Sequence, residues 1–150
     1  MLPFLKNSNP PTLPLGFVLD TGKPPRAQSL NRLLSRCSED TYPPNLLKLA
    51  LEKSAFNMSI WQVKDSNLVG FVRATSDRGL NANLWNLVAE PGDNQQDLLK
   101  VLVYNALKVL RRDMPGCSVS VSAKPYLIQP LKSQGFLLDP GGIRAMGFNL

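Results

Sequence analysis

The pattern of apolar and polar positions over residues 83–112 predicts a strand, a sharp turn and a long amphipathic helix. The strand covers Leu84–Ala89, and Pro91 ends it because proline cannot donate a hydrogen bond to a ladder. After the turn, apolar side chains recur every three or four residues, as is typical of a helix that packs on one face. Asp93 and Gln96 have the spacing of a capping box, which predicts that the helix begins at Asp93.

The rest of the chain alternates between shorter strands and helices, and the turns between them are rich in glycine and proline. Pro130 is expected to kink or split the last helix, and Gly135 to cap it. Antiparallel strands come first, and a strand–helix–strand crossover over 84–122 then pairs strands in parallel. The remaining predicted strands are 16–20, 58–63, 68–74, 118–122, 136–138 and 143–150, and the remaining predicted helices are 27–36, 46–54 and 125–134.

The length of 150 residues suits one domain over 16–150, preceded by an irregular, proline-punctuated arm over 1–15. No apolar run approaches the roughly 20 residues that span a bilayer, and the N-terminal stretch lacks a signal-peptide core. We therefore expect a cytoplasmic protein that does not enter the membrane. Its two cysteines, Cys37 and Cys117, are expected to be reduced.

The chain has no histidine, which removes the usual general base and the commonest metal ligand. With two cysteines as well, the sequence predicts no metal site. The net charge of +6 fits either an ordinary basic surface or an anionic partner such as a phosphorylated cofactor. Nucleic acid is weakly supported, because no basic run has interleaved aromatic residues.

Four segments stand out, at 68–77, 84–91, 135–136 and 142–147, and together they resemble the GNAT superfamily of N-acetyltransferases. Leu68–Ala74 followed by Ser76-Asp77 looks like the family's "LVGFARVxSD" strand and turn, and Leu84–Pro91 looks like its next strand. Gly135-Phe136 is similar to the "LGF" entry to the penultimate strand, and Gly142–Gly147 to the closing strand of small plastid- and cyanobacteria-type members. The resemblance covers about residues 16–150. It implies an α/β fold with a mixed, mostly antiparallel sheet, one parallel crossover and four helices.

The resemblance further implies acetyl transfer from acetyl-CoA to an amine acceptor. In the family, the pantetheine arm pairs with the strand backbone at the positions of Leu87, Val88 and Ala89. The pyrophosphate lies on the N-terminus of the next helix, where free N–H groups and the helix dipole attract it. Acceptor sites in this fold come from the first two helices and the last hairpin, and a homodimer is left open.

The pyrophosphate loop departs from the family pattern "R-G-x-G-x-G". The aligned residues are Asn94, Gln95, Gln96, Asp97, Leu98 and Leu99, so none of the glycines is present. Asp93 and Asp97 stabilise a helix start but repel a pyrophosphate. Two interpretations stay open: a structural helix that has lost the phosphate cradle, or acetyl-CoA binding through backbone N–H groups aided by Lys124, Lys100, Arg111 or Arg112.

Acid–base candidates are few. The family's tyrosine position is Leu131 here, and its carboxylate position on the central strand is Asn86, which cannot act as a base. Tyr126 is therefore the candidate acid and Asp77 the candidate base, although a packing tyrosine and a turn aspartate are the alternatives. Trp61 and Trp85 are expected in the core. The leading hypothesis is an N-acetyltransferase that works by direct attack, and the alternative is a non-catalytic GNAT-fold binding module.

Overall fold

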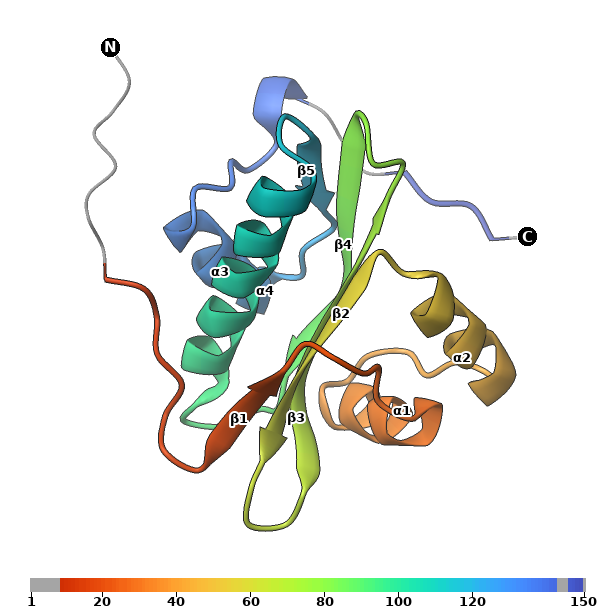
Figure 1. Ribbon diagram of the computed structural model, residues 1–150, viewed down its shortest axis with the longest axis vertical. Helices are drawn as coiled ribbons and strands as arrows, with labels where there is room; N and C mark the ends of the chain where they lie inside the picture. The colour runs from red at the N-terminus through yellow and green to blue at the C-terminus, as the bar shows by residue number, and fades with distance from the viewer. Residues whose placement is uncertain (1–8, 143–145, 150) are drawn as a thin grey trace.

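The computed structural model describes residues 9–142 and 146–149. A five-stranded sheet has the order β1-β2-β3-β4-β5, and every neighbouring pair is antiparallel except β4 and β5. Figure 1 shows α3 and α4 on one side of this sheet and α1 and α2 on the other. The strands are β1 (Phe17–Asp20), β2 (Phe56–Gln62), β3 (Asn67–Ser76), β4 (Asn81–Ala89) and β5 (Ser118–Val121). The helices are α1 (Ala27–Arg36), α2 (Pro44–Lys53), α3 (Gln95–Asp113), α4 (Pro125–Ser133) and the 3-10 turn η1 (Pro140–Gly142).

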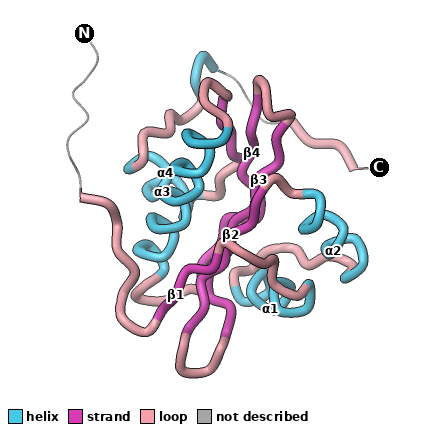
Figure 2. Tube along the Cα trace, in the orientation of Figure 1, coloured by secondary structure: helices cyan, strands magenta, loops and turns pink. Residues whose placement is uncertain are grey.

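Two apolar layers hold the helices to the sheet. Figure 2 shows the sheet lying between the two pairs of helices. Leu102 of α3 is fully buried and lies against Gly70 of β3, where an added Cβ would be 3.3 Å from the Leu102 Cδ1 atom. Glycine at this position lets α3 approach the strand closely. On the other face, Leu30 and Leu33 of α1 pack with Phe71 of β3.

Strand β4 contains a bulge in its middle. Phe71 pairs with Val88 and Arg73 with Trp85, so one residue of β3 faces two residues of β4. Asn86 has φ 53°, a left-handed conformation that asparagine tolerates better than most residues. A bulge bends its strand and leaves backbone groups outside the regular ladder.

Strands β4 and β5 separate after a short parallel contact. They pair only from Asn81 with Ser118 to Leu84 with Val121, where β5 ends. Strand β4 continues for another five residues to Ala89, and α3 follows it. The predicted mixed sheet, with one parallel crossover and four helices, is confirmed.

The predicted capping box at the start of α3 is wrong. The N-cap is Asn94, and it forms no side-chain capping hydrogen bond. The Gln96 amide instead donates to the backbone oxygen of Tyr126 in α4, at 3.2 Å. Pro130, four residues after Tyr126, has no N–H for that oxygen, so a side chain of α3 replaces the missing helical bond. This bond helps to explain why α4 runs through Pro130 without being split.

The C-terminal region also differs from the prediction. Gly135 ends α4 as expected, because Phe136 N–H donates to Leu131 and Gly135 N–H to Lys132 in a Schellman arrangement. Residues 136–138, however, form no strand, and neither do 146–149; the rest of the predicted strand 143–150 lies outside the described residues. A run of apolar residues forms a strand only where it pairs with a neighbouring strand, and these segments are not part of the sheet. Within residues 9–142 and 146–149, no helix is long and apolar enough to cross a membrane.

Candidate functional site

A cavity of about 200 Å³ lies where β4 parts from β5. Three walls meet there: the bulged half of β4, the connection between α1 and α2, and the entry to α4. The gap exists because β5 ends at Val121 while β4 runs on. The lining residues are Leu34, Glu39, Asp40, Tyr42, Leu84, Trp85, Asn86, Leu87, Val88, Val121, Ser122, Lys124 and Leu127.

The β4 wall carries the bulge and an exposed tryptophan. The Trp85 side chain is 44% exposed and lines the cavity, so its predicted place in the core is wrong. Its indole Nε1 donates to Thr75 Oγ1 at 2.8 Å, which fixes the ring beside the opening. Trp61, in contrast, packs against the α1 cluster. Trp85 points away from its buried neighbour Leu84, to the face of the sheet that carries Arg73, its partner in β3.

The second wall is the connection between α1 and α2, which supplies Glu39, Asp40 and Tyr42. Asn31 of α1 holds this connection with two hydrogen bonds, accepting from Tyr42 N–H at 3.0 Å and donating to Tyr42 O at 2.8 Å. None of these residues was predicted as part of the site. The segment has no periodicity, and its two adjacent carboxylates are the only signal that could have drawn attention to it.

Glu39 ties this connection to α4. Its Oε2 lies 2.7 Å from Lys124 Nζ, and its Oε1 accepts a hydrogen bond from the Tyr126 hydroxyl at 3.1 Å. The hydrogen bond to Glu39 raises the pKa of Lys124. Burial raises the pKa of Tyr126 first, and the charge of Glu39 raises it further. The hydroxyl proton of Tyr126 is therefore held by Glu39, and its predicted role as general acid stays a prediction.

Replacing Glu39 with glutamine is expected to lower the pKa of Tyr126, because the substitution removes the negative charge beside the hydroxyl. Ultraviolet titration of the three tyrosines should show one that ionises late in the wild type and earlier in E39Q. Since the folded pKa of Tyr126 is raised, its contribution to stability is complete below pH 10 and is lost at higher pH. The Tyr126→Phe variant is the control, because it should lack the late transition. Three tyrosines ionising together in the wild type would contradict this assignment.

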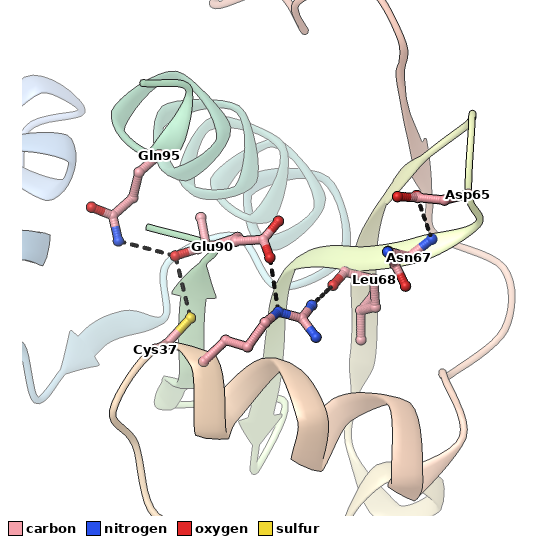
Figure 3. Close-up of polar contacts among 8 residues, drawn as sticks. Cys37, Asp65, Asn67, Leu68, Glu90 and Gln95 are labelled. Carbon is pink, nitrogen blue, oxygen red and sulfur yellow. Dashed lines mark hydrogen bonds and ion pairs between the residues drawn. The ribbon is translucent and has the colours of Figure 1, made fainter. Parts of the chain in front are cut away.

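The far end of β4 is held by α1 and α3. Figure 3 shows the thiol of Cys37 and the amide of Gln95 meeting at one backbone oxygen, that of Ala89, at 3.3 and 3.0 Å. Arg36 of α1 pairs with Glu90 at 2.8 Å and donates to Leu68 O at 2.7 Å. Burial raises the pKa of Cys37 to about 11, so this thiol stays protonated at neutral pH. Both cysteines are free, as predicted.

The predicted cofactor residues lie along one path from the cavity to the start of α3. Leu87 and Val88 line the cavity, Ala89 follows them, and Lys124 faces them from α4. At the helix start, the backbone N–H groups of Gln96 and Asp97 have no acceptor among the described residues. The side chains of Leu98 and Leu99 are buried, at 2% and 0% exposure, and the N–H group of Leu98 already donates to Asn94 O at 3.0 Å. Asn94 is the N-cap of α3, and Gln95 is the first residue of the helix.

Asp77 does not line the cavity. Its Oδ1 accepts backbone N–H groups of Gly79, Leu80 and Asn81 at 2.9, 2.8 and 3.0 Å, in the turn between β3 and β4. These bonds lower its pKa to about 2, the bond from Asn81 contributing most. So weak a base, committed to a turn, does not suit the predicted proton acceptor. Among the residues that the structure describes, no cluster of acidic or cysteine side chains could hold a metal ion.

The geometry can be compared with known proteins. No family model matches the chain. The chain is 37% identical over 106 residues to an uncharacterized N-acetyltransferase ycf52 of Pyropia yezoensis, covering 69% of this chain and 60% of that protein. A probable acetyltransferase of unknown function from Staphylococcus aureus superposes with a TM-score of 0.80, over 89% of this chain and 99% of that one, at 12% identity.

The chain belongs to the GNAT superfamily. A ycf52-like N-acetyltransferase of Prochlorococcus marinus is 32% identical over 117 residues, 77% of this chain and 64% of the relative. Relatives of plastid and cyanobacterial type thus confirm the kind of GNAT member that the sequence resembles. Histone acetyltransferase TAP1 of Glycine max is 27% identical over 140 residues, 87% of this chain and 60% of that one. The chain spans about three fifths of the length of these curated relatives.

Proposed function

We propose that this GNAT chain is an N-acetyltransferase that moves an acetyl group from acetyl-CoA to an amine by direct attack. The observation that carries the proposal is the cavity at the β4 bulge, with the N-terminus of α3 beyond the same strand. Names of the relatives support it, since several are N-acetyltransferases. The cytoplasmic location and a homodimer stay predictions.

The described residues fit acetyl-CoA in part. The free N–H groups of Gln96 and Asp97 are oriented donors for phosphate oxygens, and the backbone of Leu87 and Val88 borders the cavity. Two features oppose binding: the Asp97 carboxylate stands in the first helical turn, and side chains already occupy the Ala89 oxygen. We therefore expect acetyl-CoA to bind, with only weak interactions between the chain and its pyrophosphate.

The chemistry needs three contributions from the chain. It must orient the amine beside the thioester, donate a hydrogen bond to the oxygen that becomes negative, and accept one proton. We assign this hydrogen bond to a backbone N–H group at the bulge, because a bulge leaves its extra residue outside the ladder. Asp40 lines the cavity and is exposed, and we assign it, through water, as the proton acceptor. This assignment replaces Asp77.

Calorimetric titration with acetyl-CoA and with desulfo-CoA at low salt tests the proposal. Binding of both, together with acetylation of a panel of primary amines, is expected. Absence of heat and of a thermal shift at millimolar ligand would overturn the acetyltransferase proposal and favour the non-catalytic binding module. Binding without transfer to any amine would also favour that alternative.

Asp97→Asn is expected to tighten acetyl-CoA binding about fivefold at low salt, because a like charge about 4 Å away in water costs about 1 kcal/mol. The same change should destabilise the fold slightly, since a carboxylate in the first turn favours the helix dipole. Titrations at two salt concentrations should show that the gain shrinks as screening increases. Glu52→Gln, an equal change of charge on α2, is the control and should not alter affinity. Unchanged affinity in D97N would contradict placing the pyrophosphate at α3.

A further inference from the structure

Arg73 is a partly buried cation on β3, directly behind the cavity wall. It lies two residues after Phe71, so it shares the sheet face that carries α1 and α2. Its Nε donates to Asn86 Oδ1 at 2.7 Å, and its Nη1 is 3.4 Å from Ser54 Oγ. Asn86 and Trp85, the latter its partner across the ladder, both line the cavity. Arg73 does not itself line the cavity, and Asn86 connects its guanidinium to the space in which we place the acceptor.

This cation lacks a counter-ion among the described residues. The ion pairs found there join Arg36, Arg112 and Lys124 to acids, and Arg73 takes part in none of them. Both of its hydrogen-bond partners are neutral. Burial lowers the pKa of Arg73, which Tyr42 opposes as the lesser influence. Holding a half-buried charge without an opposite charge costs stability, and an anion arriving from outside would relieve that cost.

The hydrogen bonds of Arg73 and Asn86 leave donor groups of both side chains without an acceptor among the described residues. A guanidinium can only donate, so the bond to Arg73 fixes the oxygen of Asn86 toward it and leaves the Asn86 amide NH₂ for another partner. Arg73 Nη2 also has no acceptor among the described residues. Two neighbouring donors, one of them charged, match the two oxygens of a carboxylate.

We propose that Arg73 and Asn86 form a subsite for a carboxylate of the acceptor, so that the amine acetylated belongs to an amino acid or another amino-carboxylate. The inference rests on the proposed function, because it names the acceptor class of the same cavity. The wall that carries Asp40 suits the amine end, since an ammonium group is attracted by a carboxylate before it loses its proton, whereas Glu39 beside it is already paired with Lys124. An acceptor with one positive and one negative group thus matches both walls.

Equilibrium binding tests the subsite without catalysis. The probes are 4-acetamidobutyrate and 4-acetamidobutanamide, which have the same size and differ in charge, and Trp85 in the cavity wall provides a fluorescence signal. We expect the carboxylate to bind about tenfold or more tightly than the amide in the wild type, and equally in R73Q. Arg78→Gln, which removes the same charge in the exposed turn after β3, should keep the preference. Equal binding of the two probes by the wild type would overturn the subsite.

Kinetics supply the second test, with acetyl-CoA and either 4-aminobutyrate or 4-aminobutanamide. The ratio of kcat/KM for the two acceptors, divided by the same ratio in R73Q, cancels the intrinsic reactivity of the amines. We expect this quotient to be about ten or larger, with R73K in between because it keeps the charge and loses the planar fork. A quotient near one, with both acceptors acetylated, would overturn the subsite and leave the acetyltransferase proposal standing.

The two failures can be told apart. Absence of acetyl-CoA binding and of transfer to both acceptors would refute the proposed function, while the fluorescence titration would still decide whether Arg73 binds a carboxylate. Melting temperatures of R73Q and R73K show whether either variant is folded. If R73Q does not fold, the binding test uses R73K. Loss of the preference for the carboxylate probe in a folded R73K supports the subsite. Full retention of that preference refutes a role for the guanidinium fork.

Discussion

Deleting Asn86 is expected to lower acetyl transfer by about a hundredfold or more while the protein still folds. Without this residue, Leu87 would face Val72, and β4 would pair with β3 in a regular ladder from Trp85 to Val88. The backbone N–H groups that the bulge frees would return to the ladder. Loss of one such donor to the developing oxyanion typically costs about 100- to 1,000-fold in kcat. Steady-state kinetics with the amide acceptor, which does not depend on Arg73, measures the effect.

Asn86→Gly is the matched control for the deletion. Glycine accepts the positive φ of this position, so the bulge should persist although the side chain is gone. We expect N86G to lose much less transfer to the amide acceptor than the deletion does. Similar losses in the two variants would mean that the side chain of Asn86, and not the bulged backbone, carries the effect.

Leu102→Ala is expected to destabilise the protein by about 2 to 5 kcal/mol, the usual cost of truncating a fully buried leucine. The loss should lie at the upper end of this range if α3 cannot move closer to fill the space. Because Gly70 has no side chain, α3 already lies close to β3 at this point, which leaves the helix little room to move closer. Urea denaturation followed by circular dichroism gives the free energy of unfolding and its m-value.

Leu80→Ala serves as the control for this truncation. The Leu80 side chain is 74% exposed in the turn before β4, so the same chemical change should alter stability by no more than about 0.5 kcal/mol. If the free energy of unfolding of L102A fell as little as that of L80A, the α3 layer would contribute little to stability, which would contradict the packing described for it.

Elements with strong local patterns could be predicted from the sequence. Helix α1 was expected at 27–36 and is observed at Ala27–Arg36, because its three buried leucines have helical spacing and proline precedes it. The parallel crossover was also predicted correctly, since proline and glycine mark both ends of α3. The predicted strand 136–138 failed because these residues form no ladder with a neighbouring strand: Phe136 packs against the core from outside the sheet, and Leu137 and Leu138 are exposed.

Much of the site could not be predicted, because it depends on contacts between distant segments. The bulge at Asn86 arises from the register between β3 and β4, which no local pattern encodes. Gln96 looked like a capping residue, yet its amide binds the Tyr126 oxygen that Pro130 leaves free. Glu39 could not be identified as a cavity residue from the sequence, because its partners Lys124 and Tyr126 lie in a distant part of the chain. Most strand and helix backbones were predictable, and Leu87, Val88 and Lys124 line the cavity as expected, whereas Glu39, Asp40 and Tyr42 were not predicted.

In the connection between α1 and α2, the residues that shape the cavity are different from the residues that form the apolar core. Glu39, Asp40 and Tyr42 shape the cavity but are absent from both apolar clusters, whereas the leucines of α1 a few residues earlier are fully buried. Mutations of the exposed Asp40 and Tyr42 can therefore change which molecules enter the cavity at a small cost in stability, whereas Glu39 also ties the segment to α4. Such a segment is a natural place for lineages to diversify, and for protein engineers to build libraries, because most variants will still fold.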